Sequence, residues 1–196
     1  MIIRKLFEVE SAHIVRSCTS ERCSHSIHGH SAKIELFFES DKLDNGQMVM
    51  DFGLMKNSIK QFIDSMDHCY LLCQREDREF RDFIKSKCDR YIEFDWNPSA
   101  EMLSAFILAG VNYIISHMQF NNGEQNVKCI KCRYHETRTG YAEADMNDVQ
   151  NFLAGLTWND VEFSEGVRKD WSQELTNCID KGEDIINPVI ETQIIF

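Results

Sequence analysis

Residues 28–38 read HGHSAKIELFF, and two kinds of side chain alternate through the whole stretch. One set of alternate positions holds His28, His30, Ala32, Ile34, Leu36 and Phe38. Residues 3–13 alternate in the same way. Their apolar face holds Phe7, Val9, Ser11 and His13. A period of two predicts antiparallel strands with one buried and one solvated face, so two long strands carry histidines on the faces that we expect to be buried.

The segment after the second strand predicts a hairpin and a helix. Asn45-Gly46 is a turn signal, and residues 47–50 are expected to begin the return strand. Asp51 can cap a helix whose apolar residues continue at helical spacing to Met66.

A longer helix and a final pair of strands complete the pattern. Asn97-Pro98 predicts a helix start, with Asn as the N-cap, and the apolar residues run to about Met118. Residues 126–136 and 140–146 are expected to be strands. The order β-β-α-α-β-β predicts an α+β fold in which two helices cover one face of a four-stranded antiparallel sheet.

Two segments stand apart from this pattern. Residues 69–97 include the heavily charged stretch 74–90, which predicts a solvated surface helix or an insertion. Residues 147–196 hold one short helical pattern and the apolar end NPVIETQIIF. We therefore expect one domain over residues 1–146 and a C-terminal extension of unknown role.

Composition restricts the class of protein. The chain has 196 residues, and 21 Lys and Arg against 32 Asp and Glu give a net charge of −11, which argues against nucleic acid as the main partner. No apolar run approaches the roughly 20 residues of a membrane helix. The amino end, MIIRKLFEVE, is too short and too charged for a signal peptide. We expect a cytoplasmic protein, with its eight cysteines present as thiols.

The strand histidines predict a metal centre. His28 and His30 are two residues apart and project to the same side of a strand, and His13 ends the apolar face of the first strand. Buried imidazoles need hydrogen-bond partners or a metal. Three histidines without an obvious fourth protein ligand match a catalytic zinc with an open position. A hydrogen-bonded HGH loop is the alternative.

A CxxC at Cys129 and Cys132 invites a different zinc site. We expect a strand there, and residues three apart on a regular strand point to opposite faces. The sequence contains no second CxxC. A zinc ribbon is therefore disfavoured.

Two further groups suggest proton-transfer chemistry. Cys23 lies five residues before His28, and a nearby dication favours the thiolate, which can act as base or nucleophile. An ordinary loop cysteine, with Cys18 in the catalytic role, is the alternative. Asp67-His68 predicts an orienting carboxylate beside a proton-shuttling imidazole, against a capping or surface pair.

Glu136 ends the expected strand 126–136, and Ile130, Cys132 and Tyr134 share its face. A carboxylate in that place suits a guanidine-like N–H edge, as in a pterin, whereas the alternative is a surface residue at a strand end. The histidines and this glutamate each close the apolar face of a strand. That coincidence predicts a single pocket.

Six motifs in register resemble the 6-pyruvoyl-tetrahydropterin synthase / 6-carboxytetrahydropterin synthase family. They are FEVESAHIV, C(x4)HGH, GQMVMDFGLMK, MDHCYL, NPSAE and HETRTGY, between residue 3 and about residue 146. The resemblance implies the tunnelling fold, in which subunits join their sheets into a barrel and two trimers stack as a homohexamer. The stretch 69–97 is longer than the family's usual connection, and the tail after 146 has no counterpart in it.

The resemblance also implies roles for particular residues. Zinc is bound by His13, His28 and His30. Cys23 is the catalytic cysteine, and its partners Asp67 and His68 come from the neighbouring subunit. Glu136 anchors the pterin ring. Ser99 and Ala100 stand where the family has small hydroxyl residues that contact it. Candidates for contact with the triphosphate are Arg16, Arg22 and Arg138.

The implied activity is that of a 6-carboxytetrahydropterin synthase of queuosine biosynthesis. Such an enzyme converts 7,8-dihydroneopterin triphosphate to 6-carboxytetrahydropterin, acetaldehyde and triphosphate. The compact C(x4)HGH favours this product over that of a 6-pyruvoyl-tetrahydropterin synthase, which eliminates triphosphate and keeps the carbon chain. A non-catalytic module that binds pterin or metal is the alternative from another class.

Overall fold

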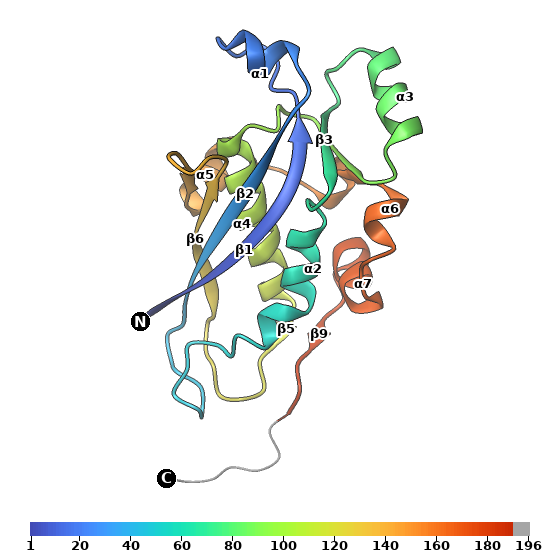
Figure 1. Cartoon of the computed structure of the whole chain (residues 1–196). Coiled ribbons are helices and arrows are strands. Elements are labelled where there is room, and N and C mark those ends of the chain that lie inside the picture. The colour runs from blue at the N-terminus through green and yellow to red at the C-terminus, as the bar shows by residue number, and fades with distance from the viewer. Residues whose placement is uncertain (190–196) are drawn as a thin grey trace.

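A single sheet organises the computed structural model, which describes residues 1–189 (Figure 1). Its antiparallel half consists of β1 (Ile2–His13), β2 (His28–Glu39), β6 (Lys128–His135) and β7 (Ala142–Ala144). β1 and β2 pair along their whole lengths, with His13 opposite His28. β6 pairs with the other edge of β2, and β7 pairs with β6. The predicted four-stranded antiparallel sheet is confirmed.

Three short strands extend this sheet beyond β1. They are β3 (Cys69–Cys73), β4 (Tyr91–Phe94) and β8 (Glu162–Phe163). β3 runs parallel to β1 and β4, and β8 runs antiparallel to β4, so the order is β7-β6-β2-β1-β3-β4-β8. All five residues of β3 are buried. The strand therefore lacks the alternation that sequence analysis detects.

The charged stretch 74–90 contains the expected surface helix, α3 (Arg78–Lys87), which lies between β3 and β4. Asp77 caps it by accepting the main-chain N–H of Phe80. Among the residues of the helix itself, only Ile84 is buried. The segment is thus a helix framed by two strands that belong to the main sheet.

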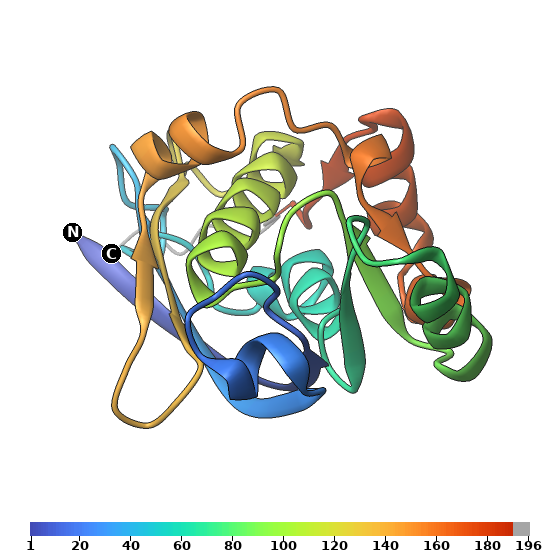
Figure 2. The ribbon, with the colours of Figure 1, turned by 90° about the horizontal axis from the view of Figure 1, so that it is seen from above.

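Two helices, α2 and α4, lie over one face of the antiparallel strands (Figure 2). With a preceding 3-10 turn, the elements are η1 (Leu54–Lys56), α2 (Ser58–Asp64) and α4 (Ala100–Ser116). The prediction of one helix beginning after Asp51 is wrong. Asp51 accepts the N–H of Gly53 in a local turn, and Asn57, with φ −95° and ψ −115°, separates η1 from α2.

The start of α4 also differs from the prediction. Ser99 is the N-cap, and its hydroxyl accepts the N–H of Met102. Asn97 is not the cap, because its side chain exchanges hydrogen bonds with the main chain of Arg16. The side chain that the local pattern assigned to the helix cap therefore binds the distant loop at Arg16 instead.

The expected return strand at residues 47–50 does not form. Instead, the carboxylate of Asp44 accepts the N–H of Met48, and the carbonyl of Asp44 accepts the N–H of Gln47, whose φ is 63°. This closes a tight turn. Val49 and Met50 then enter the core from a non-strand segment.

The residues after 146 contain more structure than the single short helical pattern that the sequence predicts, so that prediction is wrong. Besides β8, their elements are α5 (Met146–Phe152), η2 (Trp158–Asp160), α6 (Glu165–Arg168), α7 (Gln173–Lys181) and β9 (Ile185–Ile186). α5 packs on α4, and α7 packs on α2. β9 pairs with β5 (Met118–Gln119), directly after α4. The apolar end NPVIETQIIF lies outside the described residues from Ile190 onward.

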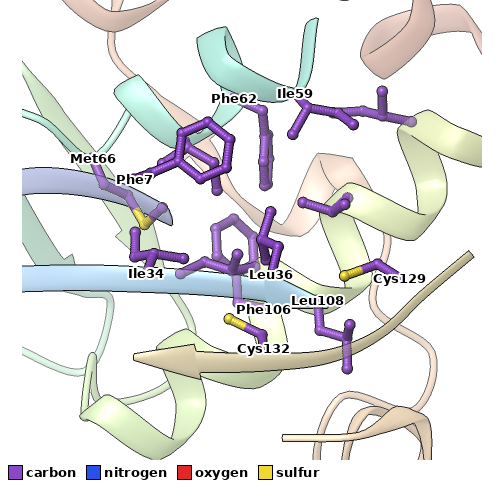
Figure 3. Close-up of a cluster of buried hydrophobic side chains, with 14 of the residues drawn as sticks. Phe7, Ile34, Leu36, Ile59, Phe62, Met66, Phe106, Leu108, Cys129 and Cys132 are labelled. Carbon is purple, nitrogen blue, oxygen red and sulfur yellow. The ribbon is translucent and has the colours of Figure 1, made fainter. Parts of the chain in front are cut away.

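One hydrophobic core joins the sheet, both covering helices and the segment after 146 (Figure 3). Cys129 and Cys132 both point into it. The expectation of opposite faces is wrong here, because a β-bulge leaves Ile130 as an extra residue between the pairs Phe38–Cys129 and Phe37–Lys131. The bulge returns Cys129 to the inner face of β6.

Candidate active site

The three predicted histidines gather at one end of the antiparallel strands. His13 ends β1, its register partner His28 begins β2, and His30 follows two residues later on the same side. Their ring centroids are 4.6 to 5.2 Å apart. One nitrogen from each ring lies within 4.8 Å of the others. The long β1–β2 pairing therefore converts two distant sequence motifs into one cluster.

Backbone carbonyls set the tautomer of two of these rings. The Nδ1 of His13 lies 2.7 Å from the carbonyl of Pro98, and that of His28 lies 3.0 Å from the carbonyl of Ser26. Because a carbonyl only accepts, each Nδ1 carries a proton, and the Nε2 atom is the nitrogen through which either ring can bind a metal. Burial lowers the pKa of His13 to about 4, so this ring is neutral at physiological pH.

The donor set fits a metal ion. The Nε2 atoms of His13 and His30 are buried and have no hydrogen-bond partner in the described structure. Orphaned buried nitrogens are costly unless something binds them. Three clustered imidazoles, two of them oriented by backbone carbonyls, match a zinc site with an open fourth position.

Glu136 joins this cluster. It follows directly after β6, and its Oε1 lies 3.4 Å from the Nε2 of His13 and 3.5 Å from that of His30. The side chain is 29% exposed, so it is partly covered at the end of the strand. On the same inner face, the hydroxyl of Tyr134 lies 3.5 Å from that of Ser11. The three histidines and Glu136 therefore lie close together at this end of the sheet.

Cys23 lies in the connection between the first two histidine strands. It belongs to α1 (Glu21–His25), a helix of five residues in the segment 14–27. The thiol is half-buried. The main-chain carbonyl of Cys23 accepts the N–H of Val15, and the main-chain N–H of Cys23 donates to the carbonyl of Ser20. Cys18 is half-buried in the same segment, and its thiol donates to the carbonyl of Ser20.

Asp67 and His68 form a hydrogen-bonded pair at the outer edge of β1. The carboxylate of Asp67 lies 3.0 Å from the Nδ1 of His68 and accepts the main-chain N–H of Glu10. Burial would raise the pKa of Asp67, but these hydrogen bonds outweigh it and hold the pKa below its ordinary value. His68 has a φ of 50° and a 76% exposed side chain. Within the described residues, no hydrogen bond or ion pair links this pair to the histidine cluster.

The remaining sequence candidates lie around the start of α4 and in loops. Ser99 caps α4, and Ala100 is the first residue of that helix. Ser99 directly follows Pro98, whose carbonyl orients His13. Arg22 and Arg138 are exposed. Arg16 is engaged instead: its guanidinium donates to Glu76 and to the carbonyl of Ser24. Sequence reasoning missed Glu76 because its partner is 60 residues away.

The fold and this cluster define an α+β protein with a three-histidine centre at the end of an antiparallel sheet. The family model described as 6-pyruvoyl tetrahydropterin synthase matches residues 2–147. The chain belongs to this family of enzymes. Among the described residues, no helix is long and apolar enough to cross a membrane.

Similar proteins agree with this assignment. Two Helicobacter pylori proteins named 6-carboxy-5,6,7,8-tetrahydropterin synthase are each 38% identical over 173 residues, covering 87% of this chain and 86% of theirs. That match is longer than the segment that the family model covers. An Aquifex aeolicus protein of the same name is 29% identical over 60% of this chain and 73% of its own.

Solved structures show the same fold. An uncharacterized protein from Wolinella succinogenes superposes with a TM-score of 0.57 at 19% identity, covering 74% of this chain and 97% of its own. A variant of Plasmodium vivax 6-pyruvoyltetrahydropterin synthase gives a TM-score of 0.50 at 13% identity, with the same coverage. The tunnelling fold of a single subunit, predicted from the sequence, is confirmed.

Proposed function

We propose that the chain is a zinc-dependent 6-carboxy-5,6,7,8-tetrahydropterin synthase, an aldehyde-lyase-type enzyme. The substrates would be 7,8-dihydroneopterin triphosphate and one water molecule, and the products 6-carboxytetrahydropterin, acetaldehyde and triphosphate, in queuosine biosynthesis. The observation that carries the proposal is the convergence of His13, His28, His30 and Glu136. The names of the 38% identical relatives support this reaction over the 6-pyruvoyl alternative.

The three histidines would hold zinc through nitrogens that no other group occupies. Bound zinc supplies Lewis-acid chemistry, which acidifies C–H bonds next to the oxygens it binds. The thiolate of Cys23 would remove a proton from the substrate side chain. The imidazole of His68, oriented by the carboxylate of Asp67, would return a proton to another atom of that side chain.

Pterin recognition falls to Glu136 in this proposal. A carboxylate accepts two parallel hydrogen bonds from a guanidine-like N–H edge, and such charge-assisted pairs are short and directional. Its position beside the histidines would place the pterin ring next to the metal. The first turn of α4, with Ser99 and Ala100, begins at the Pro98 carbonyl that orients His13 and is the proposed second wall.

A neighbouring subunit would complete this site. His68 is largely exposed, and the pair Asp67–His68 sits on the edge of β1 rather than among the metal ligands. In the part of the chain that the structure describes, β1 pairs with β3 over residues 11–13 of β1 alone. An edge of this kind is suited to pairing with a second sheet, which supports assembly into a barrel and a homohexamer.

All eight cysteines are free thiols. That state fits a reducing compartment, and the cytoplasm is the proposed location.

Product analysis tests the proposed reaction. Purified zinc-loaded protein is incubated with 7,8-dihydroneopterin triphosphate, and acetaldehyde, triphosphate and pterins are quantified. We expect acetaldehyde and triphosphate in equal amounts. Triphosphate release with every side-chain carbon retained on the pterin would identify a 6-pyruvoyl synthase instead. Pterin binding without turnover would identify a non-catalytic module.

A further inference from the structure

The segment that carries Cys23 depends on remote contacts for its conformation. It connects His13 to His28, and its regular structure is the five-residue α1. Helices of this length are unstable in isolation. The N-cap of α1, Ser20, makes no side-chain capping bond, and Ser24 is the one buried residue of the helix. Something outside the segment must therefore hold it.

Arg16 links this segment to two other parts of the molecule. One guanidinium nitrogen, Nη1, donates to the carbonyl of Ser24 at 2.8 Å, one residue after Cys23. Another, Nε, donates to Glu76 at 2.7 Å. The main chain of Arg16 exchanges two hydrogen bonds with the side chain of Asn97. The arginine thus ties the α1 backbone to the start of α4 and to the segment between β3 and α3.

Glu76 is built into the fold rather than solvated. Its side chain is 5% exposed, and its main-chain N–H donates to Cys73 at the end of β3. The ring of Phe80, in α3, lies 5.9 Å from the guanidinium of Arg16. A buried carboxylate paired with a two-pronged donor gives directional support. Figure 1 shows α1 and α3 at the same end of the sheet.

We propose that Arg16, held by Glu76, is a positioning residue that sets the location of the Cys23 thiol relative to the histidine cluster. The inference rests on the proposed catalytic role of Cys23. It gives the segment between β3 and β4 a function, namely support of the active-site loop. Two of the five N–H donors of Arg16 are engaged in this support, so the proposal gives the residue a structural role that is separate from its candidacy for triphosphate contact.

Glu76→Ala is the main test, and Glu79→Ala is the matched control, since Glu79 is exposed and only three residues away. The zinc content of Glu76→Ala should be unchanged. Its kcat should fall about 10- to 100-fold, because misplacement of a reacting group by about 1 Å has that scale of effect. Its KM for dihydroneopterin triphosphate should stay near that of the parent protein. Arg16→Gln should behave in the same way.

Iodoacetamide labelling, read by peptide mass spectrometry, reports the loop without turnover. In Glu76→Ala and Arg16→Gln, Cys23 should be alkylated faster because α1 is released, while the buried Cys129 and Cys132 stay protected. Unchanged kcat and unchanged labelling would overturn the proposal. So would a raised KM with normal kcat, which would assign Arg16 to the substrate, or equal losses in Glu79→Ala.

Cys23→Ala separates this inference from the proposed function. If Cys23→Ala retains full turnover, the catalytic role of the thiol is wrong, and the positioning proposal fails with it even where labelling shows a released loop. If Cys23→Ala is inactive while Glu76→Ala and Arg16→Gln are normal in both assays, only the positioning proposal fails.

Discussion

At the scale of single residues, the candidate site is defined by unsatisfied nitrogen atoms. The Nε2 atoms of His13 and His30 are buried without partners, while backbone carbonyls occupy the Nδ1 atoms of His13 and His28. This arrangement is costly in an empty site and favourable around a cation.

We expect about one zinc ion per chain in the parent protein and almost none in His28→Ala, because two histidines rarely retain zinc. His25→Ala is the control: this histidine is exposed and bonds to the hydroxyl of Ser24. Elemental analysis of purified protein measures the metal, and circular dichroism checks the fold. Stoichiometric zinc in His28→Ala would contradict the three-histidine assignment.

Glu136→Gln should weaken pterin binding by about 2–4 kcal/mol, the scale of a charged hydrogen bond plus an unpaired group. The amide keeps the shape but turns one acceptor into a donor that faces a donor. Titration with neopterin measures the affinity, and zinc content should be unchanged. Glu8→Gln, on the exposed face of β1, is the control. Loss of zinc with normal pterin affinity would place Glu136 on the metal instead.

At the scale of elements, α4 is the element against which the site and the core are assembled. The Pro98 carbonyl before it orients His13, and the side chain of Asn97 fixes the main chain of Arg16. Its middle packs tightly on α2. A Cβ at Gly110 would lie 2.1 Å from the Cζ atom of Phe62, so the two helices approach more closely than any larger residue allows.

Gly110→Ala should therefore destabilise the protein by up to about 2 kcal/mol, because an overpacking cost of about 1–3 kcal/mol outweighs the roughly 1 kcal/mol that alanine contributes within a helix. Urea unfolding gives the free energy. Combining it with Phe62→Leu, which removes the clashing ring atoms, should recover part of the loss. A Gly110→Ala protein more stable than the parent would show that α2 and α4 can separate freely.

At the scale of the whole molecule, the segment after 146 completes the hydrophobic core. Trp171, Leu175 and Cys178 are buried in the same cluster as Phe62, and the indole N–H of Trp171 donates to Ser65 at the end of α2. Arg90 adds a polar tie, with bonds to the carbonyls of residues 64, 67 and 166. The segment therefore also supports the turn that carries Asp67 and His68.

Leu175→Ala should lower the free energy of unfolding by about 2–5 kcal/mol, the usual cost of such a cavity. Glu174→Ala, exposed on the same helix, should change it by less than about 0.5 kcal/mol.

A chain that ends at residue 147 should fail to fold, because loss of the segment after 147 removes one wall of the core. Equal stability of the truncated and full chains, measured by denaturation, would show that the segment is dispensable.

Complementation between subunits tests the shared site. Cys23→Ala and His68→Ala chains should each be inactive as pure assemblies. After they are unfolded and refolded together, mixed assemblies should regain activity, because an intact Cys23 can meet an intact His68 from a neighbour. Light scattering should report the mass of a hexamer. Mixtures without activity, although assembled, would place both residues in the same subunit's site.

Much of the fold could be predicted from local patterns. The alternation of apolar and polar residues in β1 and β2 reflects one face that is buried in the core and one that faces water, and the register of strands this long follows from burying one face. His13, His28 and His30 fall on that face, so the histidine cluster was already implied by the spacing of the residues. The long apolar helix α4 and the charged helix α3 could be predicted for the same reason, since each pattern is contained within its own segment.

Contacts between distant segments decided the rest. The turn at Asp44, which Asn122 ties down by hydrogen bonds to residues 44 and 45, replaced the expected return strand, and the bulge at Ile130 turned Cys129 inward. The side chain of Asn97 hydrogen-bonds to the main chain of Arg16 instead of capping the helix, and the guanidinium of Arg16 donates to Glu76, sixty residues away. These outcomes depend on which groups meet in space, because hydrogen bonds and packing across the fold override weak local preferences. The sequence alone determined the four antiparallel strands, the positions of the three histidines on them and the family, whereas only the tertiary structure decided what supports them.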